Sequence, residues 1–272
     1  MLRARVATVA VLLPLFVGGM FFLGQIWWAL LLLPLLLAGG REWAALAGFS
    51  RNGNLAYCGI LAASAAVLLW GGELHRSQQA LDAAIFGIAV AFWFLLAPLW
   101  LWRGWRLRDP LFLGLTGWIL VVPTWLALVR LQQWPWVLLA VLGVVWVADS
   151  AAYFAGHFWG RRKLAPSISP GKTWEGVAGA AIGVAVYHAL VWKLGFSVIA
   201  PQSAGAAALL VAVLLPLSII GDLFESWIKR QAGVKDSGNL LPGHGGVLDR
   251  IDALTATLPL AALAVPWLLL RT

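Results

Sequence analysis

The sequence predicts an all-α, polytopic integral membrane protein with about nine transmembrane helices and a cytoplasmic N-terminus. The chain is 62% hydrophobic and only 11% charged, whereas an ordinary soluble domain carries about 25% charged residues. Apolar runs recur along almost the whole length, each within a stretch long enough to cross about 30 Å of hydrocarbon. One soluble core cannot bury so much apolar surface, so lipid is the expected solvent.

The spans follow from the length of each apolar run and from the charges at its ends. Arg3 and Arg5 precede the first run, as basic residues do in a signal peptide. No convincing small-residue cleavage site precedes a soluble domain, so we interpret this run as the first spanning helix. The nine predicted spans are residues 5–22, 26–40, 55–70, 83–101, 111–129, 134–150, 176–192, 204–221 and 252–270.

Positive charge predicts the orientation. With the N-terminus inside, the outer connections hold only four of the 19 basic residues, Arg76, Arg130, Lys193 and Arg271. The positive-inside rule then places the two longest polar connections in the cytoplasm. This orientation explains the net charge of +8 better than nucleic-acid binding does, because the basic residues are dispersed among apolar segments. The single cysteine, Cys58, excludes an internal disulfide, and the basic chain fits a bacterial inner membrane.

Tryptophan and glycine mark expected contacts of the spans. Trp residues gather near the predicted span ends, Trp27, Trp28 and Trp100 among them. An amphipathic ring suits the headgroup layer, so we expect these residues to be interfacial anchors.

Gly179 and Gly183 form a G-x-x-x-G pair that would let another helix of the same chain approach closely.

Acidic residues concentrate in the second half of the chain. No internal repeat or linker divides the sequence, so we expect one membrane domain. Within it, residues 1–133 supply helices without a specific motif, apart from Glu42, and residues 134–272 form the catalytic region with its cytoplasmic loops. A carboxylate at the bilayer centre costs about 2.5–3.5 kcal/mol, so acidic residues at span ends need partners, water or a metal ion. Seven of the 11 acidic residues follow position 148: Asp149, Glu175, Asp222, Glu225, Asp236, Asp249 and Asp252.

The spacing of these late polar residues predicts a shared helix face. Asp249 and Asp252 are three residues apart, which places them on one side of a helix. A longer set lies at i, i+3, i+4 and i+7 and would point into a common cavity. Its members are Asp222, Glu225, Ser226 and Lys229.

Basic and glycine-rich residues lie between the two acidic groups. Lys229-Arg230 and Lys235-Asp236 are followed by Pro-Gly-His-Gly-Gly at 242–246, whose backbone amides could approach phosphate oxygens closely. These residues alone leave three interpretations open besides an enzyme. They are a solvated cytoplasmic loop, an ion or solute transporter with carboxylates along its path, and a structural scaffold.

The order of residues resembles the signature of a known family. The pattern Ser226-x-x-Lys229-Arg230-x4-Lys235-Asp236-x-Gly238-x3-Pro242-x-His244-Gly245-Gly246-x2-Asp249-Arg250-x-Asp252 is similar, without a departure, to that of the phosphatidate cytidylyltransferases, or CDP-diacylglycerol synthases. The stretch 149–176, which contains Ser-Pro-Gly-Lys172-Thr-Trp-Glu-Gly, is similar to the preceding block of that family. The resemblance covers about residues 146–252, and the N-terminal half matches only in hydropathy. A transporter or a scaffold leaves this order unexplained.

The resemblance implies a nucleotidyltransferase of phospholipid biosynthesis. Phosphatidic acid would attack the α-phosphorus of CTP and give CDP-diacylglycerol and pyrophosphate. A phosphomonoester has a second pKa of about 6, so this nucleophile hardly needs a general base. Two anionic substrates repel each other, so we expect Mg²⁺, one ion or two, together with cationic side chains. The other expected partners are the bilayer and, by family analogy, a second copy in a homodimer; nucleic acid is not expected. A CTP-using lipid kinase, or a synthase acting on another lipid phosphate, is the related alternative.

The resemblance also implies the site residues. Mg²⁺ prefers oxygen ligands, and the expected ligands are Asp222 and Asp249, followed by Asp252 and Asp236. Ser226 has no His partner of the kind that covalent catalysis uses, so its hydroxyl is expected to form hydrogen bonds. Arg250 could instead orient Asp249, and His244 could be held within its own loop. The expected substrate-binding set is Lys172, Ser226, Lys229, Arg230, Lys235 and Arg250, and the expected catalytic set is Asp222, Asp249, Lys229 and His244.

Overall fold

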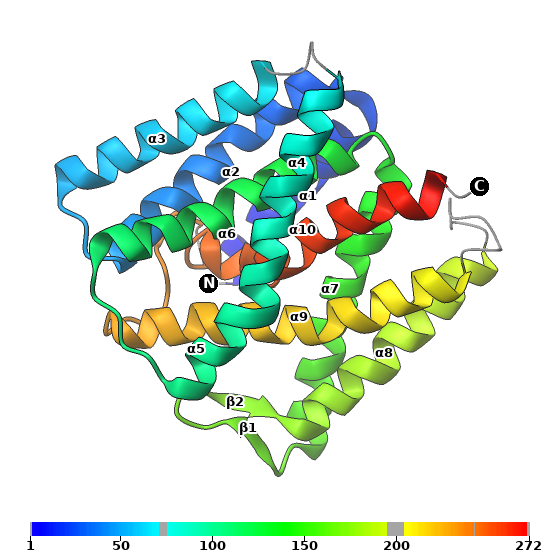
Figure 1. The fold of residues 1–272 in the computed structure, drawn as a ribbon. Coiled ribbons are helices and arrows are strands. Elements are labelled where there is room, and N and C mark those ends of the chain that lie inside the picture. Colours follow the sequence, from blue (N-terminus) through cyan, green and yellow to red (C-terminus); the bar gives the residue numbers. More distant parts are fainter. Residues whose placement is uncertain (1, 71–74, 195–203, 242, 271–272) are drawn as a thin grey trace.

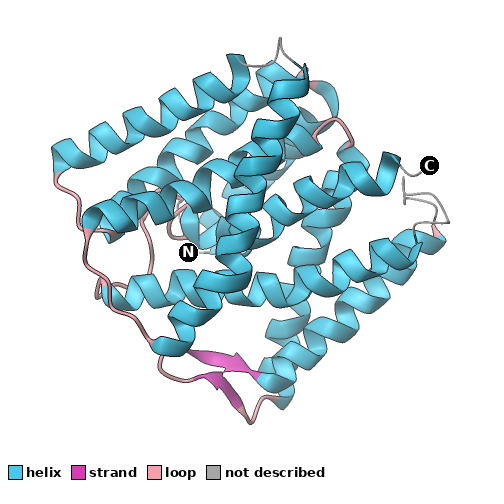
Figure 2. Ribbon diagram, viewed as in Figure 1, coloured by secondary structure: helices cyan, strands magenta, loops and turns pink. Residues whose placement is uncertain are grey.

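Helices make up most of the described chain, and one two-stranded hairpin accompanies them (Figure 2). The computed structural model describes residues 2–70, 75–194, 204–241 and 243–270. Pro242 and Arg271 lie outside the described residues, as do the side chains of Arg3, Arg5 and Arg76. The elements are α1 (Leu2–Phe22), α2 (Gln25–Leu46), α3 (Arg51–Trp70), α4 (His75–Ala91), the π-helical turn η2 (Phe92–Leu96), α5 (Ala97–Arg103), α6 (Pro110–Leu131), α7 (Pro135–Trp159), β1 (Lys163–Ala165), β2 (Ser169–Thr173), α8 (Trp174–Lys193), α9 (Ala204–Gln231) and α10 (Leu248–Leu270).

The predicted all-α membrane fold is confirmed. Among the described residues, eight helical segments are long and apolar enough to cross a membrane, and one of them, Gln78–Arg103, runs through α4, η2 and α5 without a break. In α1 the apolar stretch Thr8–Phe22 is shorter. Each of the nine predicted spans therefore falls on a helix.

Several helices extend beyond the predicted spans. Helix α7 continues to Trp159 and α9 to Gln231, and α10 begins at Leu248 instead of residue 252. The prediction counted apolar residues, but a helix continues as long as its backbone is hydrogen-bonded, whatever its side chains are. As a result, Asp222 and Asp249 stand on helices, as their i, i+3 spacing to Glu225 and Asp252 predicted.

Helix α10 lies at the centre of the bundle and packs against α9, α6, α4, α7 and α2 (Figure 1). Its N-terminal end, the C-terminal end of α9 and the β-hairpin lie toward the same end of the molecule, which we call the hairpin end. The hairpin itself was not predicted. It is short and mostly half-buried, and Lys163 pairs with Thr173 and Ala165 with Ser169.

The predicted interfacial role of tryptophan is wrong for two of the residues named above. Trp28 and Trp100 are fully buried in the core. Their indole N–H groups donate to backbone carbonyl oxygens, Trp28 to Leu128 at 3.0 Å and Trp100 to Trp105 at 2.8 Å. Hydropathy places a tryptophan near a span end, but only helix packing decides whether it faces lipid or a neighbouring helix. Trp27, in contrast, is 64% exposed, as an anchor would be.

The G-x-x-x-G pair packs α8 against α7, so the predicted internal contact is confirmed. A Cβ at Gly183 would lie 2.7 Å from the Cβ of Ala151, and one at Gly179 would overlap the Cβ of Ala155. Hydrogen in place of a side chain therefore lets the two helices, which make the most extensive contact in the fold, approach closely.

We expect Gly179→Leu to lower the free energy of unfolding by about 1–3 kcal/mol, because the added side chain overpacks the α7–α8 contact. Gly87→Leu on α4 is the matched control, since no atom lies within 4 Å of a Cβ added there. Thermal unfolding in detergent measures both variants. Equal unfolding midpoints would contradict the close packing of α7 and α8.

Candidate active site

A polar cleft lies between the C-terminal end of α7, the β-hairpin, the N-terminal end of α8 and α9. Its volume is about 560 Å³, and its charged lining residues are Asp149 on α7, Lys172 on β2 and Asp222 on α9. These residues come from segments that are far apart in the chain, and the fold brings them to one cavity. This cleft is the candidate active site.

Lys172 and Asp222 link the hairpin to α9 across the cleft. Nζ of Lys172 lies 2.5 Å from Oδ2 of Asp222, and Oδ1 of Asp222 accepts a hydrogen bond from Oγ of Ser226 at 3.3 Å. The Lys172 and Asp222 side chains remain 23% and 32% exposed. A pair this accessible is weak in water. The two groups can therefore separate, the ammonium toward a phosphate and the carboxylate toward a cation.

Neighbouring signature residues hold the hairpin in place. Thr173 caps α8, because its Oγ1 accepts a hydrogen bond from the backbone N–H of Gly176 at 3.1 Å. The Glu175 carboxylate accepts from the backbone N–H groups of Arg161 and Arg162, both at 3.1 Å. These bonds tie the end of α7 to the start of α8 and fix the strand that presents Lys172.

A second lysine is buried behind the cleft. Nζ of Lys229 lies 2.6 Å from Oε2 of Glu225 and 2.6 Å from Oδ1 of Asp249. None of the three side chains is more than 10% exposed. The ammonium thus joins α9 to the first turn of α10, and both of its carboxylate partners depend on it for neutralisation.

Asp249 also holds the segment that precedes α10. Its Oδ2 accepts hydrogen bonds from the backbone N–H groups of Ser237 at 3.0 Å and Gly246 at 2.8 Å. The hydroxyl of Ser237 donates in turn to Oε2 of Glu42 at 3.0 Å. The residues 237–248, which we call the signature segment, are therefore held from two sides by carboxylates.

Glu42 is the contribution of the N-terminal half to this arrangement. It is 8% exposed and accepts from the backbone N–H groups of Val247 at 3.0 Å and Leu248 at 2.9 Å. A Cβ at Gly238 or at Gly246 would lie 2.5 Å from one of its carboxylate oxygens. The carboxylate therefore caps the start of α10, and the two glycines are needed to admit it.

Carboxylates outnumber cations around the cleft. Asp149, Asp222 and Asp252 interact electrostatically with one another. Oε1 of Glu225 is buried and has no hydrogen bond within the described part of the chain. An oxygen-rich anionic set of this kind fits a hard divalent cation such as Mg²⁺.

The four predicted metal ligands have different surroundings. Asp222 lines the cleft, and Asp252 interacts with it electrostatically. Asp249 is engaged by Lys229 and by backbone amides, whereas Asp236 is exposed. Across the described ranges, no three His, Cys, Asp or Glu side chains converge as metal ligands. The structure thus brings Asp222 and Asp252 together and does not gather all four.

Arg230 and Lys235, both predicted to bind phosphate, lie outside the cleft. The Arg230 guanidinium donates to the carbonyl oxygens of Ile168 at 3.4 Å and Val234 at 3.2 Å. It thereby fastens the hairpin to the chain that follows α9. Lys235 is exposed.

His244 and Arg250 line a different cavity, between α1, α2, α7 and the start of α10. Nε of Arg250 donates to the carbonyl oxygen of His244 at 3.0 Å, so Arg250 does not orient Asp249 through this bond. Nδ1 of His244 is buried without a hydrogen-bond partner among the described residues. The structure therefore does not bring His244 to the cleft that Asp222 lines.

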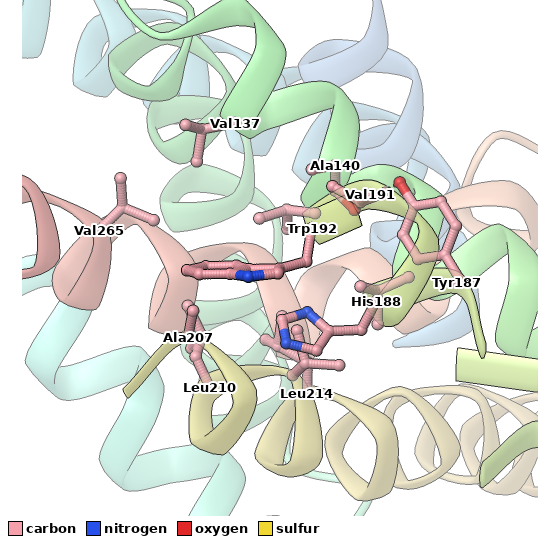
Figure 3. Close-up of a pocket in the computed structure, with 13 residues that line it drawn as sticks. Val137, Ala140, Tyr187, His188, Val191, Trp192, Ala207, Leu210, Leu214 and Val265 are labelled. Atoms are coloured by element: carbon pink, nitrogen blue, oxygen red, sulfur yellow. Dashed lines mark hydrogen bonds between the residues drawn. The ribbon is translucent and has the colours of Figure 1, made fainter. Parts of the chain in front are cut away.

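The apolar pocket in Figure 3 is not part of this site. It is small, with a volume of about 70 Å³, and is lined by residues such as Tyr187, His188, Trp192 and Leu210. These residues stand toward the C-terminal end of α8 and the N-terminal end of α9, away from the hairpin end. Among its described lining residues, the pocket has no carboxylate or ammonium group.

Sequence reasoning gave no role in the site to Glu42 or Asp149. Each is the only acidic residue of its helix, α2 or α7. A lone carboxylate within an apolar helix is costly, and that cost is the signal that could have identified both.

A family model and one known protein match almost the whole chain, and other known proteins match a little less than half of it. A model of the cytidylyltransferase family matches residues 3–268. A phosphatidate cytidylyltransferase of Pseudomonas aeruginosa is 44% identical over 281 residues, which cover 98% of this chain and 97% of that protein. The phosphatidate cytidylyltransferase of Haemophilus influenzae is 50% identical over 125 residues (45% of this chain, 43% of that protein), and that of Thermotoga maritima is 45% identical over 128 residues (45% and 46%). The match to the Pseudomonas aeruginosa protein includes the N-terminal half of this chain, in which the sequence alone showed apolar spans but no motif.

We expect Glu42→Ala to destabilise the signature segment. The substitution leaves the buried N–H groups of Val247 and Leu248 without an acceptor, at about 1–3 kcal/mol each. Thermal unfolding and limited proteolysis in detergent should show a lower midpoint and cleavage within residues 237–248. Asp109→Ala, which removes an exposed cap of α6, should cost only about 1 kcal/mol. Similar losses in the two variants would contradict the capping role of Glu42.

We expect Lys229→Met to cost about 3–5 kcal/mol, because it leaves Glu225 and Asp249 buried without a countercharge. Adding Glu225→Leu to Lys229→Met should recover part of this loss, since it removes one of the two uncompensated charges. Equilibrium unfolding of the single and double variants measures the coupling. Purely additive losses would rule out the buried pairing.

Proposed function

Because this chain belongs to the cytidylyltransferase family, we propose that it is a phosphatidate cytidylyltransferase, which joins CTP to phosphatidic acid and forms CDP-diacylglycerol and pyrophosphate. One observation carries the proposal: a relative of that name is similar over 98% of the chain. The site geometry supports it. Asp149, Lys172 and Asp222 converge in a cleft with room for a nucleotide.

The reaction is a displacement at phosphorus. An oxygen of the phosphatidate phosphate attacks the α-phosphorus of CTP, and the bond from that phosphorus to the oxygen bridging toward the β-phosphorus breaks. Pyrophosphate leaves with the bonding electron pair. The nucleophile is already an anion, so the protein's task is to position two anionic groups in line and to offset their repulsion.

Lys172 is the candidate ligand for the phosphates of CTP. It stands on a strand fixed by Thr173 and Glu175, and its ammonium is accessible although it pairs with Asp222. Lys229 has a different role. Its ammonium is already held by Glu225 and Asp249, so it positions the signature segment and does not bind substrate directly.

Asp222 and Asp252 are the proposed ligands of Mg²⁺, and the excess of carboxylates around the cleft supports this assignment. When bound, Mg²⁺ would neutralise phosphate charge and help to orient the reacting groups. Asp249 and Asp236 are weaker candidates as Mg²⁺ ligands, because Asp249 is paired with Lys229 and Asp236 is exposed.

The proposed orientation follows the positive-inside rule. The hairpin end would face the cytoplasm of a bacterial cell, where CTP is made, and the helices would lie in the inner membrane. Phosphatidic acid would then reach the site from the cytoplasmic leaflet.

We expect the purified protein to release pyrophosphate and form CDP-lipid when CTP, phosphatidic acid and Mg²⁺ are all present. Asp222→Asn should reduce kcat by about a hundredfold or more, because it removes charge from the cleft where two anionic substrates meet. Asp109→Asn, at an exposed helix cap, is the matched control. To test the related reactions, a polyprenyl phosphate replaces phosphatidic acid in one assay and ATP replaces CTP in another. A folded wild-type protein without turnover on CTP and phosphatidic acid would contradict the proposal.

A further inference from the structure

A largely apolar groove lies on the other side of α7 and α10 from the polar cleft. It has a volume of about 520 Å³ and is lined by α1, α2, α7, the signature segment and the first turns of α10. Arg250 is the one charged residue among its described lining residues, and His244 stands beside it. We call this cavity the α1–α2 groove.

We propose that the α1–α2 groove holds the acyl chains of phosphatidic acid and that Arg250 binds the phosphate of the same lipid. This inference rests on the proposed function and adds to it the path by which the lipid reaches the site. The nucleotide and the lipid then approach from opposite sides of α7.

The groove has the depth of one lipid leaflet. Its lining on α2 extends from Leu31 to Ala38 and on α1 from Thr8 to Phe16, which are about 10 and 12 Å at 1.5 Å per residue. Half of the hydrocarbon layer is about 15 Å thick. The polar residues Arg250 and His244 lie at the hairpin end of this depth, where a lipid headgroup would be, and apolar residues line the rest.

Arg250 is suited to bind a phosphate. Its Nε donates to the carbonyl oxygen of His244, and its two terminal amino groups have no hydrogen-bond partner within the described residues. A guanidinium held in this way offers two parallel donors to phosphate oxygens. Its charge also interacts with Asp149, which lines the polar cleft. A phosphate on Arg250 therefore lies at the border between the two cavities.

Helix α7 is the wall that the two cavities share. Trp146 lines the groove, and Asp149, one turn further on, lines the cleft. The apolar pocket of Figure 3 also reaches α7, where Val144 lies five residues before Asp149. Its described lining residues include no arginine or lysine, so a lipid there would have no guanidinium or ammonium group for its phosphate.

Two variants that fill the groove test the proposal kinetically. Leu12→Trp and Ala38→Trp narrow it from α1 and from α2, and Leu55→Trp adds the same side chain at a site on α3 that is 67% exposed. We expect the first two to raise KM for long-chain phosphatidic acid about tenfold, which corresponds to the loss of about two buried methylene groups. KM for CTP, and KM for a short-chain phosphatidic acid that cannot fill the groove, should stay at the value of the Leu55→Trp control.

The outcomes separate the inference from the function on which it rests. A wild-type protein without turnover on either lipid contradicts the proposed function. An active wild type whose groove variants match Leu55→Trp for every substrate overturns the groove alone. An increase in KM for the short-chain lipid equal to that for the long-chain lipid also overturns it, because the variants would then act on the headgroup site.

Photocrosslinking gives a readout that does not depend on turnover. Phosphatidic acid with a diazirine near the end of one acyl chain is irradiated with the wild-type protein, and the adducts are mapped to peptides. We expect adducts on α1 between Thr8 and Phe16 and on α2 between Leu31 and Ala38. Adducts confined to α8 and α9 around Tyr187 and Leu210, or spread evenly over the lipid-facing helices, would overturn the proposal.

Discussion

The buried ammonium of Lys229 is the constraint on which the rest of the site depends. It pairs with both Glu225 on α9 and Asp249 on α10 in surroundings that exclude most water. A buried charge of this kind is strongly destabilising once its partner is lost, so the two helices are fixed relative to one another. Asp249, held in this way, can then bind the amides of Ser237 and Gly246 and set the path of the signature segment.

The N-terminal helices support this arrangement although they carry no recognisable motif. Glu42 caps the start of α10 from the opposite side of the signature segment. Phe224, which precedes Glu225, is fully buried and makes edge contacts with Phe92, Trp93 and Trp100, at 5.2–5.5 Å between ring centroids. The π-helical turn η2 contributes the first two of these rings. Aromatic packing on one face of α9 thus sets its rotation and directs the acidic face toward the cleft and α10.

Helices α7 and α10 divide the space at the hairpin end into a polar cleft and an apolar groove. The cleft is lined by Asp149, Lys172 and Asp222, and the groove ends at Arg250. A nucleotide and a lipid require opposite surroundings, one wet and charged and the other apolar. Two cavities that share a helical wall can meet both needs and still let the reacting phosphates come together.

The sequence by itself determined the helical membrane fold, the family, and two of the three charged residues that line the cleft, Lys172 and Asp222. Hydropathy depends on composition along the chain, and the motif from Ser226 to Asp252 is continuous, so neither requires knowledge of distant contacts. Only the tertiary structure decided which of these residues face one another. It assigned Lys229 to Glu225 and Asp249, placed Arg230 on backbone carbonyl oxygens, and moved His244 and Arg250 to another cavity. It also gave Glu42 its role and buried Trp28 and Trp100. These outcomes depend on how helices far apart in the chain rotate and pack, and helical spacing specifies a face without specifying what that face meets.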